Sequence, residues 1–230
     1  MLITFILAII PIIFLGLFIY KSDVVEKEPI YLLCKLFIFG VISTIPCVFI
    51  ESLFIKTVFS SFDTNTIIYK LLVSIFCIAL VEEGYKALFT YTIAYKDKNF
   101  NHVFDGIVYS VFTSLGFACL ENILYGFEYG TGATLIRAIT SVPAHAFFGV
   151  FMGYYIGLSK QEKRKHNIKK FRSYTLLSII IPIIIHGIYD FLLLTNNNFM
   201  IIIFFILVIG LYFMSYIKIK KLNKVPTMIE

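Results

Sequence analysis

Residues 81–86 read Val81-Glu82-Glu83-Gly84-Tyr85-Lys86, and they place two adjacent carboxylates and a lysine inside a long apolar run. An ionisable side chain near the centre of a membrane helix costs about 2.5 to 3.5 kcal/mol on insertion scales. The three charges must therefore be paired, neutralised or reached by water. Each of these outcomes creates a polar pocket within an apolar segment, so this stretch indicates a functional site.

The composition of the whole chain supports a membrane setting. Of its 230 residues, 59% are hydrophobic and 15% are charged, and the mean hydropathy is +0.89. These values are far from those of soluble domains. The net charge of +6 does not indicate nucleic-acid binding, because the lysines and arginines gather in short segments between apolar runs, as membrane topology requires.

Seven apolar segments are long enough to cross a bilayer as helices. They comprise residues 1–20, 30–55, 67–95, 103–127, 133–158, 174–194 and 199–217. No soluble domain is left over, so the sequence predicts an all-α fold, a single polytopic transmembrane helical bundle over residues 1–230. The first segment lacks a basic n-region and a small-residue cleavage site, so we expect it to remain as an uncleaved helix.

The basic residues predict the orientation of this bundle. Seven lysines and arginines lie between residues 160 and 172, in the connection after the fifth segment. The positive-inside rule places this loop in the cytoplasm. The segments around Lys21, Lys96 and Lys218 are expected on the same side, with the amino terminus outside and the carboxyl terminus cytoplasmic.

The other polar residues of the apolar segments fall at similar depths. With a rise of about 1.5 Å per residue along a helix, all are expected in the middle to outer half of the membrane. They are Glu82, Glu121, His145, His186 and Asp190. A single membrane histidine more often makes a helix-to-helix hydrogen bond than catalyses a reaction. So many ionisable groups at one level, however, exceed what packing needs.

Helical spacing predicts which of these groups meet. Residues three and four apart share a face, so Lys86 can reach both glutamates, and His186 lies beside Asp190. Two stripes of small residues predict close helix packing. They are His145, Gly149, Gly153 and Gly157, and Ser110, Ser114, Ala118, Asn122 and Gly126.

Three charged residues are given no part in the site. Glu51 and Asp105 lie near the ends of their helices and are interpreted as interfacial. Arg137, near the outer end of its segment, is interpreted as snorkelling to the membrane surface.

Taken in order, the motifs of this chain resemble those of the PrsW intramembrane proteases, which are relatives of the CAAX prenyl proteases and bacteriocin-processing membrane proteases. The motifs are Glu82-Glu83-x-x-Lys86, Phe117-x-x-x-Glu121-Asn122, Pro143-Ala144-His145 and His186-x-x-x-Asp190. The broader superfamily commonly has histidine and asparagine where this chain has Glu121 and Asp190, so the PrsW branch matches better. The resemblance implies a multi-pass enzyme of the bacterial cell membrane. It also implies that the enzyme makes the first, outer-side cut in a single-pass anti-sigma factor.

Peptide hydrolysis needs a base that activates water and donors that stabilise the oxyanion, and two mechanisms fit these residues. In the metal mechanism, Glu121, His145 and His186 hold Zn²⁺ and Glu82 or Glu83 is the base. In the metal-free mechanism, one of the two glutamates is the base, and His186, His145 or Asn122 donates to the oxyanion. Lys86 supports the glutamate pair, and Asp190 fixes the ring of His186. The chain has no HExxH motif, and the cofactor is left open at this point.

Two functions of other classes remain as alternatives. A proton- or ion-coupled transporter also uses membrane carboxylates and histidines, although no inverted repeat is visible in the chain. A non-catalytic membrane scaffold would use the same cluster for packing alone. Other intramembrane proteases fit worse, because Ser114 is not in a GxSG motif and the GxGD motif of presenilin-like aspartyl proteases is missing.

Overall fold

The computed structural model describes residues 2–224 and 227–229, with side chains for 2–222 and 227–229. Met1, the expected first residue of the first span, lies outside these ranges. The helices are α1 (Leu2–Ser22), α2 (Ile30–Thr57), α3 (Ile67–Leu72), the π-helix η1 (Val73–Ala79), α4 (Leu80–Ile93), α5 (Val103–Ile139), α6 (Ser141–Arg164), α7 (Ile168–Leu194) and α8 (Asn198–Lys224). A helix satisfies its own backbone hydrogen bonds, which lipid cannot do. The predicted all-α fold is confirmed.

Five helical segments of the described chain are long and apolar enough to cross a membrane. They are Leu2–Ser22, Ile30–Thr57, Val103–Arg164, Ile168–Leu194 and Asn198–Leu222. Val103–Arg164 contains both α5 and α6, whereas residues 67–93 are divided among α3, η1 and α4 and are not one of the five. The chain is a multi-pass membrane protein, and the count of seven crossings and the orientation of the termini stay predictions.

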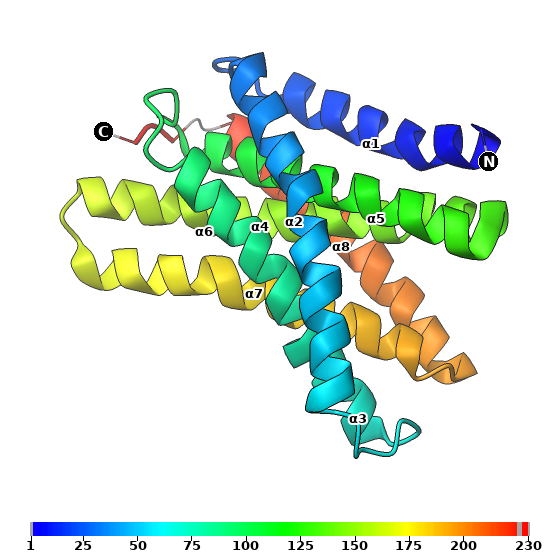
Figure 1. Cartoon of the computed structure of the whole chain (residues 1–230). Coiled ribbons are helices and arrows are strands. Elements are labelled where there is room, and N and C mark those ends of the chain that lie inside the picture. Colours follow the sequence, from blue (N-terminus) through cyan, green and yellow to red (C-terminus); the bar gives the residue numbers. More distant parts are fainter. Residues whose placement is uncertain (1, 225–226, 230) are drawn as a thin grey trace.

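The centre of the bundle is formed by α5, α6 and α7. Figure 1 shows these helices side by side, with α1 along α5 and with α2 crossing α5 steeply. Buried apolar residues of α5 and α6, including Ile107, Val111, Met152 and Ile156, form the core. Large apolar side chains such as Phe14, Phe49 and Phe213 are exposed on the outside, where a bilayer would cover them.

Small residues allow α5 and α6 to approach closely. A Cβ added to Gly153 would overlap the backbone of Gly106 on α5, and a Cβ added to Gly149 would lie 2.9 Å from Ser114 Oγ. The stripes of small residues on these two helices are therefore packing surfaces, as predicted. Because they share this contact, α6 carries His145 toward the core of the bundle.

The boundaries of the fifth predicted span are wrong. Residues 133–158 do not form one helix, because α5 continues to Ile139 and α6 begins at Ser141, on either side of Thr140. Within α5 the helix is interrupted at Gly130, whose positive φ of 82° is a conformation that glycine adopts without strain. Pro143 lies in the first turn of α6, where a missing N–H removes no helical hydrogen bond.

The basic run at residues 160–172 is mostly helical, because α6 ends at Arg164 and α7 begins at Ile168. Lysine and arginine are good helix formers and are favourable near a helix carboxyl end. This connection shares one end of the bundle with the other basic segments. Gln161 Nε2 donates to the carbonyl oxygen of Met228 at 3.1 Å, and Asn101 Nδ2 donates to Glu26 at 2.9 Å. That these segments lie on the cytoplasmic side of the membrane stays a prediction.

Candidate active site

The glutamate pair lies in the first turn of α4, directly after the π-helix η1. The wider π-turn is seen in the bond from the Leu80 N–H to the carbonyl oxygen of Ile75. Such turns occur often at functional sites, and they change the face on which the following residues lie. Glu82 is 5% exposed, and Glu83 and Lys86 are fully buried. The apolar sequence of residues 73–79 did not predict this π-turn.

Lys86 provides the positive charge that these two carboxylates need. Its Nζ donates to Glu83 Oε1 at 2.7 Å and to Glu82 Oε2 at 3.1 Å, as the helical spacing predicted. The same ammonium lies 3.0 Å from His145 Nδ1 and 4.0 Å from the centre of the Phe117 ring. The attraction to several partners offsets part of the desolvation cost of this buried charge.

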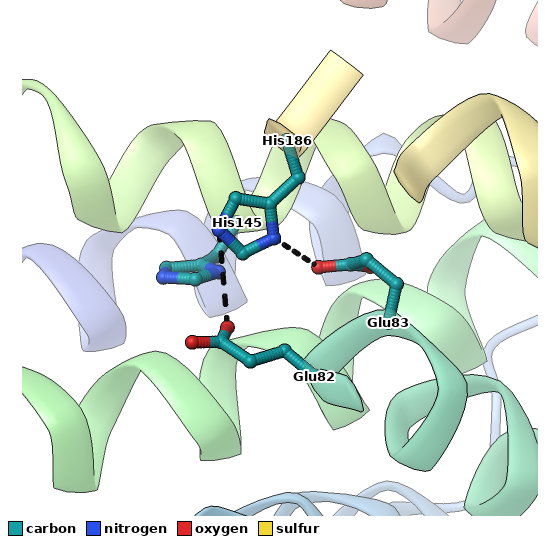
Figure 2. A group of neighbouring side chains, drawn as sticks. All are labelled: Glu82, Glu83, His145 and His186. Carbon is teal, nitrogen blue, oxygen red and sulfur yellow. Dashed lines mark hydrogen bonds and ion pairs between the residues drawn. The ribbon is translucent and has the colours of Figure 1, made fainter. Parts of the chain in front are cut away.

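His186 of α7 lies over both glutamates, as Figure 2 shows. Its Nδ1 is 2.9 Å from Glu83 Oε1, and its Nε2 is 3.9 Å from Glu82 Oε2. Asp190, one turn later, places Oδ2 3.2 Å from Nε2, which confirms the predicted contact between these two residues. Phe148 stacks on the imidazole with 4.7 Å between ring centres. The ring of His186 is thus held from three sides.

Glu121 of α5 holds the second histidine. Its Oε2 lies 2.8 Å from His145 Nε2 and 2.9 Å from Arg137 Nη2. Arg137 does not snorkel to the surface as predicted, because the chain folds back after Gly130 and brings its Nε within 3.3 Å of Asn122 Oδ1. Sequence reasoning missed this arginine as part of the site. The sequence did contain one usable signal. Arg137 is a charged residue in an apolar segment, and this segment directly follows the one that carries Glu121.

Two further polar residues, Asn122 and Glu51, lie near the cluster. Asn122 is fully buried, and its amide contacts Arg137 and the carbonyl oxygen of Ala8, at 3.2 Å. Both ends of this amide are therefore engaged outside the group of Glu82, Glu83 and the histidines. Glu51 was interpreted as interfacial, but its Oε1 is buried with no hydrogen-bond partner among the described residues, because α2 packs against η1 there.

The described side chains bring four ligand atoms close together. Glu82, Glu83, His145 and His186 each offer one atom, and all four atoms lie within 4.8 Å of one another. Carboxylates and imidazoles are ligand types that Zn²⁺ takes in catalytic sites. In addition, Glu83 Oε2 is buried and has no hydrogen-bond partner among the described residues. The residues therefore fit a metal ion, although the group is not the predicted ligand set.

The predicted zinc ligands and the group found in the structure differ at Glu121. It was a predicted ligand together with His145 and His186, but the group within 4.8 Å has Glu82 and Glu83 in its place. Glu121 instead contacts the outer nitrogen of His145, and Asp190 contacts His186. A carboxylate behind a histidine commonly orients a metal-binding ring. The arrangement of two carboxylate-backed histidines beside two buried glutamates suits water activation.

Comparison with known proteins agrees with this chemistry. The sequence profile described as PrsW family intramembrane metalloprotease matches residues 28–217. The chain is 38% identical over 222 residues to Protease PrsW of Clostridioides difficile (strain 630), covering 94% of this chain and 90% of the relative. It is 33% identical over 176 residues to Protease PrsW of Bacillus subtilis (strain 168), covering 76% of each chain. No solved structure gives a significant match. The chain therefore belongs to the PrsW family of intramembrane metalloproteases and is a membrane-embedded peptidase.

Proposed function

We propose that this peptidase hydrolyses a bond in a single-pass membrane protein, in the outer half of the bilayer, as the first cut in an anti-sigma factor. The observation that carries the proposal is the buried cluster of Glu82, Glu83, His145 and His186, whose ligand atoms lie within 4.8 Å of one another inside a membrane bundle. A transporter or a scaffold does not need a candidate base beside two oriented imidazoles. The substrate class rests on the resemblance of the motifs to the family.

The level of the cluster supports cleavage in the outer half. At about 1.5 Å per residue, His145 lies about 28 Å along α6 from Arg164, and His186 lies about 27 Å along α7 from Ile168. Both helix ends belong to the basic end of the bundle. If that end is cytoplasmic, as the positive-inside rule predicts, the two histidines lie beyond the middle of a hydrocarbon core about 30 Å thick.

The two glutamates differ in their contacts, and this difference divides their roles. Glu83 is fully buried and is bound at 2.7 Å by Lys86 and at 2.9 Å by His186. Glu82 has longer contacts, 3.1 Å to Lys86 and 3.9 Å to His186. We assign the general base to Glu82, which takes the proton of the attacking water. Glu83 then positions His186 and Lys86.

The same residues would hold the metal that the family description implies. Glu83, His145 and His186 would be its ligands, which leaves Glu82 to accept a proton from water. A bound Zn²⁺ supplies a Lewis acid that polarises the scissile carbonyl and acidifies water. Asp190 and Glu121 orient the two rings, whose distances to these carboxylates are 3.2 Å and 2.8 Å. Lys86 holds both glutamate side chains toward the cluster.

The proposal is tested with the full chain and a candidate single-pass anti-sigma factor in reconstituted membranes. Glu82→Gln removes the base and keeps the size of the side chain, and we expect cleavage to fall by about 10²- to 10⁴-fold. Glu83→Gln should also lower cleavage, because it removes the carboxylate that positions His186 and Lys86 and that would bind the metal. Glu128→Gln, an exposed glutamate on α5, is the matched control and should cleave normally. Intact cleavage by both active-site variants would contradict the assignment.

The metal is tested on the same preparations. We expect about one Zn²⁺ per chain by elemental analysis, loss of this metal in His145→Ala and His186→Ala, and sensitivity of cleavage to a chelator. Metal content is measured independently of activity, so it distinguishes a lost ligand from a lost base. Full cleavage by a metal-free preparation would eliminate the metal mechanism and leave Glu82 as a base without one.

A further inference from the structure

A second group of buried carboxylates lies at the basic end of the bundle. Asp23 and Glu28 lie in the connection between α1 and α2, and Asp105 lies in the first turn of α5. They are 3%, 3% and 2% exposed, and one oxygen atom of each lies within 4.8 Å of the others. Asp105 is about 24 Å along α5 from Glu121, at 1.5 Å per residue, so this group is separate from the active site. Asp105, interpreted from the sequence as interfacial, is buried because the neighbouring connections cover it.

Basic side chains lie near this group without forming a salt bridge to it in the described part of the chain, and the charge of Lys27 acts on Asp23 only from a longer distance. Among the residues that the structure describes, no ion pair includes any of the three carboxylates. Lys27 is the nearest lysine in sequence, but its Nζ donates to the backbone carbonyl oxygens of Tyr20 at 2.9 Å, Lys21 at 3.2 Å and Asp23. The contrast with the active site is clear, because Lys86 there contacts both carboxylates directly.

Neutral donors satisfy only part of the group. Asp105 Oδ2 accepts from the backbone N–H groups of Asn101 and His102 at 2.8 and 2.7 Å, and Tyr109 donates its hydroxyl to Glu28 Oε2. Asp23 Oδ2, by contrast, is buried and has no hydrogen-bond partner within the described part of the chain. A buried oxygen without a partner is energetically unfavourable, and more so when it is charged.

The raised pKa values of Glu28 and Asp23 also indicate that the charged forms of these carboxyl groups are disfavoured. Burial, followed by the negative charge of Asp105, raises the pKa of Glu28 to about 9. Burial also raises the pKa of Asp23. Carboxylic acids whose charged forms are disfavoured by each other and by burial are stabilised when a cation joins them.

We propose that Asp23, Glu28 and Asp105 bind a hard divalent cation, Ca²⁺ or Mg²⁺, through their carboxylate oxygens. The three ligands are all oxygens, which these ions prefer and which suit Zn²⁺ less. The bound ion joins the α1–α2 connection to the start of α5. Asn101 beside this site also accepts the N–H of Ile229 at 2.7 Å, so the ion would stabilise the contact of the carboxyl-terminal tail.

Terbium luminescence tests this site in the purified full chain. Tb³⁺ binds to calcium-type oxygen sites and is sensitised by a nearby tyrosine; Tyr109 contacts Glu28, and the chain has no tryptophan. We expect saturable emission that excess Ca²⁺ or Mg²⁺ displaces, and the two displacement curves identify the preferred ion. Asp23→Asn and Glu28→Gln should each weaken Tb³⁺ binding at least about tenfold, as expected when a charged ligand becomes neutral.

Two control variants test whether the Tb³⁺ emission comes from the proposed site. Glu26→Gln changes an exposed carboxylate of the same connection and should bind Tb³⁺ as the unchanged chain does. Tyr109→Phe should lose emission while Ca²⁺ still raises the thermal-unfolding midpoint relative to EDTA. The proposal is overturned if the unchanged chain shows neither saturable emission nor a cation-dependent midpoint. It is equally overturned if Asp23→Asn and Glu28→Gln bind Tb³⁺ with unaltered affinity.

Discussion

At the scale of single residues, buried charges in this protein are stabilised by specific partners. Lys86 lies between two glutamates at 2.7 and 3.1 Å, and Arg137 contacts Glu121 at 2.9 Å. The first contact follows from helical spacing alone. The second joins residues that are 16 positions apart across the chain reversal at Gly130, and no local pattern predicts it.

Removing Arg137 should expose the cost of this second pair. Arg137→Met leaves Glu121 without its cation, and we expect a loss of about 2 kcal/mol in unfolding free energy, less than the 3–5 kcal/mol typical of fully buried pairs. The smaller value is expected because the two side chains are 15% and 16% exposed. Unfolding of the purified protein in detergent measures the effect.

A double variant that removes the charges of both Arg137 and Glu121 is the control for this prediction. The double variant Arg137→Met, Glu121→Gln should recover part of the lost stability, since no unpaired charge remains. It should still cleave poorly, because the carboxylate behind His145 is gone. Arg172→Met, at an exposed position, should be as stable as the unchanged chain. A fully stable Arg137→Met variant would show that the pair has no net effect.

At the scale of helices, the contact between α5 and α6 sets the position of His145. Gly106 and Gly153 meet backbone to backbone, and neither position has room for a Cβ. The sequence predicted the contact surface from its small residues. It did not predict the break at Thr140 or the π-helix η1, because no local sequence pattern marks either of them.

Substitution of a contact glycine should therefore disturb the helix pair. Gly153→Ala inserts a methyl group into a filled contact, and we expect a loss of about 1–3 kcal/mol, with reduced cleavage because α6 shifts. Gly210→Ala on α8 is the matched control, since no atom lies within 4 Å of the added Cβ, and alanine is the better helix former. Equal unfolding midpoints for the two variants would contradict the packing argument.

At the scale of the whole molecule, the basic connections gather at one end. Contacts of Asn101 with Glu26 and of Gln161 with Met228 tie these segments together. The connection between α7 and α8, residues 195–197, lies about 40 Å along α7 from Ile168, at 1.5 Å per residue. The two connections of α7 are therefore expected on opposite sides of the membrane.

Cysteine labelling tests this orientation. In a variant whose four native cysteines are replaced, we expect a membrane-impermeant maleimide added outside intact cells to label Asn196→Cys. Lys165→Cys should be labelled only after the membrane is permeabilised. Both residues lie in short connections, so exposure alone does not distinguish them. Labelling of Lys165→Cys from outside would reverse the assigned topology and place the active site nearer the cytoplasm.

The sequence by itself determined that this protein is a helical membrane bundle with polar residues concentrated near Glu82 and Glu83. Those features depend on hydropathy and on helical spacing, which are local properties. The tertiary structure decided that His145 and His186 join the two glutamates, that Glu121 lies behind His145 with Arg137, and that Asp23, Glu28 and Asp105 meet. These contacts depend on helix packing and on chain reversals between distant segments, which no local pattern encodes.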